Sequence, residues 1–221
     1  MRLESGTVIE ASALLFDMDG TLIDSRVVVE KIWKRWCDEN GIDWHYVLPR
    51  LHGVRMIDSV KMFVKPGMDV DAVFQRLYRE EVEDVDGIVQ IPGAHALLAA
   101  LPPSAWTIVT SADLELAKAR LDAAGIVPPP LMVTGDIITN GKPDPEGYLL
   151  GAKRMNAAPE DTLVFEDAKA GIDAGLAAGA RVIAIAGDHP EEIPEDVEWV
   201  ADLTALRVES VAGGKVRLVV V

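Results

Sequence analysis

The chain has 221 residues, enough for one globular domain or for a domain that carries a smaller insertion. Hydrophobic residues make up 49% of it and charged residues 26%, so it can bury a large core and widespread disorder is not expected. The 36 Asp and Glu residues outnumber the 21 Lys and Arg residues, and the resulting net charge of −15 repels nucleic acid and anionic membrane surfaces. We therefore expect a role that involves neither nucleic acid nor a membrane.

The expected compartment is the cytoplasm. The single cysteine, Cys37, has no partner for an internal disulfide, which fits a reducing environment. No stretch approaches the roughly 18 consecutive apolar residues that a membrane span needs. Near the N-terminus, Glu4 and Glu10 stand where a secretion signal would have a basic region followed by an apolar run. We expect a monomer or a weak homodimer.

The first predicted element is a short buried strand at 13–16, which ends at Asp17. Apolar residues at helical spacing follow it (Val29, Ile32, Trp33 and Trp36), and Gly41 is a plausible end for that helix. The region as far as residue 91 is helix-like and rich in charge, without a clear buried strand. We predict an all-helical insertion at 25–91, placed between residues 1–24 and 92–221 of one core.

From residue 92 onward, strands and helices alternate. Strands are predicted at 106–110, 131–133, 162–165 and 181–185, and helices at 94–101, 114–124, 145–155 and 168–178. This alternation is typical of an α/β fold with a doubly wound parallel sheet that is covered by helices on both faces. The last residues alternate on either side of Gly213 and Gly214, which predicts a C-terminal β-hairpin.

Two acids, Asp17 and Asp19, follow the first predicted strand. Active sites of open α/β sheets lie beyond the carboxyl ends of the strands, where these residues are expected. Two close carboxylates ionise together only when a cation lies between them, or one stays protonated and acts as an acid. Taken on its own, this pair would be read as a solvated turn. A calcium loop is excluded because Leu22 and Val28 occupy the positions that require Gly and a bidentate acid.

A second pair of acids, Glu166 and Asp167, ends another apolar strand. The pair is weak evidence alone, because a helix N-terminus also favours acids. If the sheet brings the two pairs together, their oxygens form the kind of ligand set that Mg²⁺ prefers.

Two further segments are suited to binding a phosphate group. Thr110 and Ser111 end a third strand, where a hydroxyl and backbone N–H groups bind anions, although helix capping by Ser111 or Asp113 explains them as well. Lys142 lies between Gly141 and Pro143. The segment is not a P-loop, since proline replaces the required Ser or Thr, but a rigidly held lysine there would neutralise phosphate charge. Alone, it would be read as a surface lysine in a turn.

Together, these segments resemble the motifs of the haloacid dehalogenase-like hydrolase superfamily, over nearly the whole chain. D-M-D-G-T at 17–21 resembles the first motif, T-S at 110–111 the second, G-K-P-D-P at 141–145 the third, and F-E-D-A with G-I-D-A-G the fourth. The resemblance implies that Asp17 is the nucleophile and Asp19 the general acid and base. It also implies that the second and third motifs, with Thr110, Ser111 and Lys142, bind the phosphoryl group.

The same resemblance implies a Mg²⁺ cofactor and a mobile cap. The metal would be bound by Asp17, the backbone carbonyl of Asp19 and Asp167, with Glu166 bound directly or through water. The cap would be the insertion at 25–91. Asp19 weighs against a dehalogenase, in which no leaving alkoxide needs a proton.

Within the superfamily, the chain resembles the branch that holds glycerol-3-phosphatases and 2-deoxyglucose-6-phosphatases. It rests on H-G-V-R at 52–55, I-P-G-A, V-F-E-D-A-K-A-G-I and the C-terminal hairpin. The resemblance implies a small phosphorylated polyol or sugar as substrate, contacted from the cap by His52, Gly53 and Arg55. A surface ion pair explains Arg55 equally well.

Two alternatives remain open. A β-phosphoglucomutase-like isomerase shares all four motifs and the cap; Thr21 and the H-G-V-R segment favour the phosphatase weakly. A non-catalytic binding protein on the same scaffold is less favoured, because every acid of the motifs is present.

Overall fold

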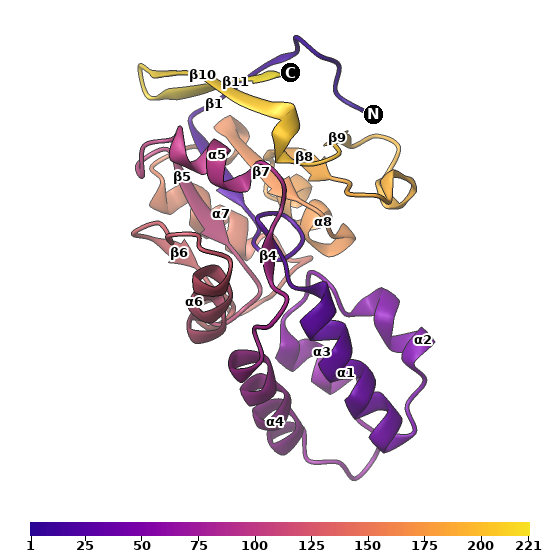
Figure 1. Cartoon of the computed structure of the whole chain (residues 1–221). Helices are drawn as coiled ribbons and strands as arrows, with labels where there is room; N and C mark the ends of the chain where they lie inside the picture. The colour runs from indigo at the N-terminus through magenta and orange to yellow at the C-terminus, as the bar shows by residue number, and fades with distance from the viewer.

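A six-stranded parallel sheet forms the centre of the molecule (Figure 1). The computed structural model describes residues 1–221. The strand order is β6-β5-β2-β7-β8-β9, and every neighbouring pair is parallel. The strands are β2 (Ala13–Phe16), β5 (Trp106–Val109), β6 (Met132–Val133), β7 (Thr162–Glu166), β8 (Arg181–Ile185) and β9 (Glu198–Val200). Each predicted strand is confirmed to within one residue at either end, whereas β9 was not predicted.

Helices cover both faces of this sheet. They are α5 (Ala94–Ala99), α6 (Leu114–Ala123), α7 (Glu146–Arg154) and α8 (Lys169–Ala177), and short 3-10 helices lie at Leu48–Arg50, Gly135–Ile137, Pro159–Asp161, Pro190–Glu192 and Leu203–Ala205. All four residues of β2 are buried. Its Leu14 and Phe16 belong to the same core cluster as the apolar residues of α5 and α6, whereas Leu15 clusters with those of α7 and α8. The predicted doubly wound arrangement is confirmed.

The topology determines where a site can form. Going along the chain from β2, the next strands β5 and β6 extend the sheet on one side, and β7, β8 and β9 extend it on the other. The chain therefore reverses its direction of winding next to β2. In open α/β sheets, ligands bind in the crevice outside the carboxyl ends of the strands at such a switch point. The ends of β5, β2 and β7 lie at this place, as do the motifs that follow them.

The insertion consists of α1 (Arg26–Asn40), α2 (Trp44–Val47), α3 (Met56–Phe63) and α4 (Val70–Glu83), which lie below the sheet in Figure 1. Its core includes Trp33, whose ring packs edge-on against Trp36 and Phe63 at centroid distances of 5.6 and 6.2 Å. Helix α1 ends at Gly41, as predicted. Two short strands, β3 (Ile23–Asp24) and β4 (Val89–Gln90), pair where the chain enters and leaves, so the insertion is helical except at this neck.

The C-terminal hairpin is confirmed and belongs to a second sheet. Strands β10 (Leu206–Ala212) and β11 (Lys215–Val220) flank Gly213 and Gly214, whose φ angles of 60° and 75° suit a tight hairpin turn. Strand β1 (Val8–Ala11), which the sequence did not predict, pairs antiparallel with β11. The structure has no helix with the length and hydropathy needed to cross a membrane.

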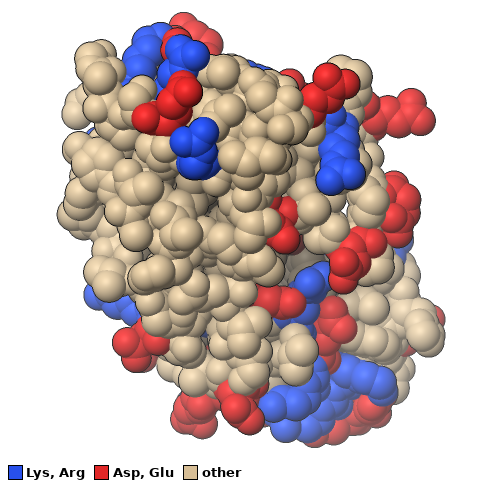
Figure 2. Space-filling view, turned by 45° about the horizontal axis from the view of Figure 1, so that its top comes forward, with Lys and Arg blue, Asp and Glu red and all other residues tan.

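Acidic and basic side chains lie close together on the surface. Figure 2 shows blue and red groups beside one another on one face, most densely at its lower end, with wide uncharged areas between. On the insertion, Lys31 pairs with Asp84 and Arg35 with Glu80, each at 2.5 Å. Several basic residues of the insertion are therefore paired with acids of the same insertion.

Candidate active site

Asp17 and Asp19 point to different surroundings at the end of β2. The backbone N–H of Asp17 donates to the carbonyl of Phe165 at 2.9 Å, which continues the pairing of β2 with β7, and Asp17 is only 4% exposed. The carboxylate of Asp19 accepts hydrogen bonds from Ser25 Oγ at 2.5 Å and from Arg120 Nη1 at 2.8 Å. Asp17 is therefore held at the sheet, whereas Asp19 faces the insertion.

Glu166 is fixed by four donors at the end of β7. Its Oε1 accepts from Lys142 Nζ at 2.6 Å and from the Tyr148 hydroxyl at 3.0 Å, and its Oε2 accepts from the backbone N–H groups of Asp167 and Ala168 at 2.9 Å each. Helix α8 leaves room for this carboxylate at Gly171, where a Cβ atom would lie 1.6 Å from Oε1. Glu166 is thus a fully buried carboxylate with one orientation.

Lys142 joins the ends of three strands. Its buried Nζ contacts Asp17 Oδ1, donates to Glu166 Oε1, and donates to the carbonyl of Val109 at 3.2 Å. Burial by itself lowers the pKa of Lys142, but the carboxylates of Asp17 and Glu166 outweigh that effect and hold the pKa above its ordinary value. The structure therefore keeps a positive charge beside Asp17. Lys142 is a buried residue and not the surface lysine that its segment alone would indicate.

The acids at this edge suit a hard divalent cation. Asp17, Glu166 and Asp167 each offer an oxygen, and these oxygens lie within 4.8 Å of one another. Loss of hydration, followed by repulsion from Glu166, raises the pKa of Asp167 well above its ordinary value. For Asp17, loss of hydration raises the pKa despite Lys142. These carboxylates outnumber the nearby cations, so they repel one another unless a further cation binds between them. Carboxylate oxygens are the ligands that Mg²⁺ and similar ions prefer, so the residues fit such an ion.

Gly20 makes this cluster of acids compact. Its φ of +85° is left-handed, and a Cβ atom there would lie 1.9 Å from Asp167 Oδ2. Thr21, the next residue, is placed with its hydroxyl 3.4 Å from Asp167 Oδ1. The turn after Asp19 therefore requires glycine both for its backbone angle and for the approach of Asp167.

Thr110 and Ser111 lie at the same edge but have different partners. The Oγ1 of buried Thr110 accepts from the N–H of Ala112 at 3.0 Å, which stabilises its own turn. Ser111 Oγ donates to the carbonyl of Gly53 at 3.0 Å and so links the core to the insertion. Both residues line the cavity that also contains Asp17 and Asp19.

The residues predicted to contact substrate from the insertion are only partly free. His52 Nε2 lies 3.3 Å from Glu30. Arg55 donates through Nε to Asp58 at 2.7 Å and through Nη1 to the carbonyl of Ile138 at 3.2 Å. Gly53 has a φ of +80° and packs against Ala168 of the fourth motif. The ion-pair interpretation of Arg55 therefore describes its contacts in this structure.

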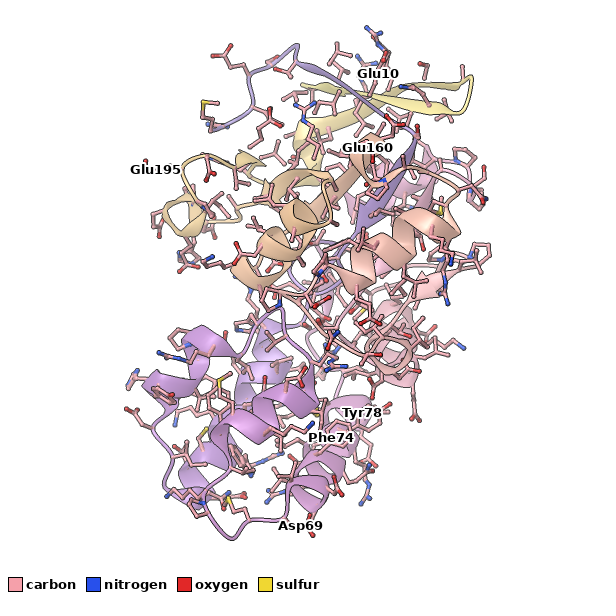
Figure 3. The ribbon with its side chains drawn as sticks, turned by 180° about the vertical axis from the view of Figure 1, so that it is seen from behind. Glu10, Asp69, Phe74, Tyr78, Glu160 and Glu195 are labelled. Carbon is pink, nitrogen blue, oxygen red and sulfur yellow. The ribbon has the colours of Figure 1, made fainter.

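The cavity above Asp17 and Asp19 is enclosed by the insertion. Trp33, Ser59, Phe74, Tyr78 and Glu81 form part of its wall. Figure 3 shows Phe74 and Tyr78 on α4, with Tyr78 nearer to α6, and the Tyr78 hydroxyl donates to Glu115 of α6 at 3.2 Å. The far side of the cavity thus combines apolar surface with hydrogen-bonding groups.

Sequence reasoning missed Arg120, Glu81 and Tyr148. Arg120 lies on the buried face of α6 with Leu116, Ala117 and Leu121, and Glu81 shares the buried face of α4 with Leu77. For Arg120 and Glu81, the available signal was a charged residue at an apolar position of a helix, because charged residues are seldom buried unless they are paired.

Known proteins similar to this chain agree with the resemblance that its motifs indicated. The model of one hydrolase family, the haloacid dehalogenase-like hydrolases, matches residues 11–179. The chain is 42% identical over 184 residues to hexitol phosphatase A of Escherichia coli (strain K12), which covers 81% of this chain and 84% of that protein.

Two proteins of Saccharomyces cerevisiae are also similar. With 2-deoxyglucose-6-phosphate phosphatase 1, the identity is 32% over 222 residues, or 90% of each chain. With glycerol-1-phosphate phosphohydrolase 2, it is 32% over 189 residues, which cover 80% of this chain and 76% of that one.

Proposed function

The chain belongs to the haloacid dehalogenase-like hydrolase family, and from this premise we propose that it is a Mg²⁺-dependent phosphatase of small phosphorylated sugars or polyols. The observation that carries the proposal is the cluster of buried Asp17, Lys142 and Glu166 with half-buried Asp167 at the switch point of the sheet. Phosphoryl transfer depends mainly on positioning and on neutralisation of charge, and this cluster is suited to both.

The phosphoryl group would bind next to Asp17. Lys142 Nζ, which contacts Asp17 in the structure, would neutralise part of the phosphate charge. Ser111 and the backbone after β5 would hold its oxygens, with Thr110 stabilising that turn. These roles follow from the family motifs and from the position of each residue at one edge of the sheet.

Two steps then complete the reaction. A carboxylate oxygen of Asp17 attacks phosphorus while the bond from phosphorus to the substrate oxygen breaks, and Asp19 gives that oxygen a proton. Water next attacks the phosphorus of the aspartyl-phosphate and gives a proton to Asp19, while the bond to Asp17 breaks. Both residues return to their starting forms, and the products are an alcohol and inorganic phosphate.

Asp17, the backbone carbonyl of Asp19 and Asp167 would hold Mg²⁺. When bound, the ion supplies positive charge that offsets the repulsion between Asp17 and a phosphate dianion. Both oxygens of Glu166 already accept hydrogen bonds, which favours a contact through water over a direct one.

The substrate class is proposed from the relatives and from the cavity. Their names describe phosphatases of hexitols, 2-deoxyglucose 6-phosphate and glycerol 1-phosphate. The cavity wall offers the Ser59 hydroxyl, which has no hydrogen-bond partner, and the carboxylate of Asp19, and such groups suit a molecule with several hydroxyl groups. We also expect His52, Gly53 and Arg55 to border the bound substrate, although Arg55 must first leave Asp58 to contact it.

We further propose that the protein acts in the cytoplasm, as a monomer or weak homodimer, without nucleic acid. The unpaired Cys37 is buried in the insertion, and burial raises its pKa to about 11, so its thiol is poorly suited to disulfide formation. The net charge of −15 disfavours binding to a phosphate backbone.

The test is phosphate release from a panel of phosphorylated polyols, hexoses and nucleotides with Mg²⁺. We expect release from polyol or hexose phosphates, and a clear preference for nucleotides would contradict the substrate proposal. Glucose 1-phosphate belongs in the panel, because formation of glucose 6-phosphate without phosphate release would identify a mutase. No release from any compound would favour a non-catalytic role.

A further inference from the structure

Arg120 connects Asp19 of the sheet with the insertion. It extends from α6, donates through Nη1 to Asp19 Oδ1 at 2.8 Å and contacts Glu81 of α4 through Nη2. Glu81 is held in turn by the indole N–H of Trp33, which donates to its Oε1 at 2.9 Å. One guanidinium group therefore joins a residue of the first motif to two helices of the insertion.

This connection is buried at its Glu81 end. The side chain of Arg120 is 5% exposed and that of Glu81 is 4% exposed, whereas Asp19, which lines the cavity, is 29% exposed. The Nε of Arg120 has no hydrogen-bond partner, which leaves the two carboxylates as its whole polar environment. A planar guanidinium holds two such groups in a fixed geometry, as a lysine would not.

The contacts also distinguish the two oxygens of Asp19. Ser25 Oγ and Arg120 Nη1 both donate to Oδ1. Oδ2 receives no hydrogen bond, and Asp19 lines the cavity. The arrangement fixes the rotation of the carboxylate and leaves Oδ2 as the oxygen available for proton exchange.

We propose that Arg120 is a positioning residue that holds Asp19 for proton transfer, and that Glu81 makes this orientation depend on contact between the insertion and the sheet. The inference rests on the proposed function, in which Asp19 is the acid and base. Arg120 itself exchanges no proton and touches no reacting atom. Its loss should therefore slow only the steps in which a proton moves.

The test compares leaving groups. Nitrophenolate leaves phosphorus without needing a proton, whereas the alkoxide of a polyol needs one; hydrolysis of the aspartyl-phosphate needs Asp19 as base in both cases. The variant is Arg120→Met with Glu81→Gln, because Arg120→Met alone would leave a buried carboxylate without a cation. Arg76→Met is the matched control, since Arg76 lies on α4 and pairs with Glu39 and Glu80 on the surface.

We expect kcat for the best polyol or sugar phosphate to fall about 100-fold in the double variant, the scale of general acid–base catalysis. With p-nitrophenyl phosphate, steady-state turnover falls as well, but the first turnover stays within about threefold of the unsubstituted protein. A burst of one nitrophenolate per protein molecule follows, because only the second step needs the base. Arg76→Met leaves both measurements unchanged.

Three results separate the possible failures. Near-normal turnover of the polyol or sugar phosphate by the double variant overturns the proposal. An equal fall in burst rate and steady-state rate also overturns it, since that result identifies a structural role. If the unsubstituted protein releases nitrophenolate but no phosphate from any sugar or polyol phosphate, the proposed substrate is wrong, and the burst comparison still decides the role of Arg120.

Discussion

At the scale of single residues, the site is built around one buried lysine. Lys142 contacts an acid that follows β2, the last residue of β7 and a carbonyl of β5, so its charge is fixed at the point where β5, β2 and β7 end. The lysine also offsets part of the negative charge of Asp17, which must approach a phosphate dianion. Removing Lys142 therefore tests whether catalysis depends on a positive charge at this one position.

Lys142→Ala should reduce phosphate release at least about 100-fold, because a preorganised charge at the reacting group is removed. Lys169→Ala is the control, since Lys169 follows the fourth motif closely but is 73% exposed and pairs only with Asp173. The measurement is kcat for both variants, with circular dichroism to compare their folds. A loss below about threefold in folded Lys142→Ala would show that the phosphate does not bind at this lysine.

At the scale of elements, helix α8 depends on glycine where it passes Glu166. Gly171→Ala would place a Cβ atom 1.6 Å from Glu166 Oε1, in a carboxylate that four donors hold in place. In a helix, alanine is favoured over glycine by about 1 kcal/mol, so a loss of stability would reveal the clash rather than a backbone effect.

We expect Gly171→Ala to lower the free energy of unfolding by about 1–3 kcal/mol and to reduce activity, since Glu166 and Lys142 must both move. Ala177→Ser, at an exposed position of the same helix, serves as the control. Urea unfolding together with the rate of phosphate release measures both effects. An unchanged or higher stability for Gly171→Ala would mean that Glu166 is not held as described.

The elements also show what the sequence predicts and what it does not. Each central strand is a short apolar run with a polar motif directly after it, so the positions of Asp17, Ser111 and Glu166 at one sheet edge were predictable. Strand β1 was missed because its partner β11 lies about 200 residues away and Glu10 faces solvent opposite Arg217. The pairing of Arg120 with Glu81 and Asp19 was missed for a similar reason, since it depends on how α4 packs against α6.

At the scale of the whole molecule, only a few of the acids that give the net charge of −15 have a proposed role in the site. Burial raises the pKa of Asp17 and Asp167. At pH values between the ordinary carboxyl pKa and these raised values, the metal-free folded protein therefore binds more protons than the unfolded chain. Its free energy of unfolding therefore falls as pH rises from about 4, the ordinary carboxyl pKa, through these raised values.

Mg²⁺ binds the ionised carboxylates, so it should raise the unfolding temperature more at about pH 8 than at about pH 5.5. Thermal unfolding with Mg²⁺ and with a chelator, at both pH values, measures this difference. Asp167→Asn is the control, because it should lose most of the stabilisation by Mg²⁺. Equal stabilisation at the two pH values would contradict a site formed by these acids.

The most direct test of the central claim is the rate of phosphate release from a hexitol or hexose phosphate by the unsubstituted protein and by Asp17→Asn, both with Mg²⁺. The amide has nearly the shape of the carboxylate but is not a nucleophile, so we expect turnover by the unsubstituted protein and a loss of at least about 1,000-fold in the variant. Retention of more than about a tenth of the activity by Asp17→Asn would contradict the account, because Asp17 would then not be the group that attacks phosphorus.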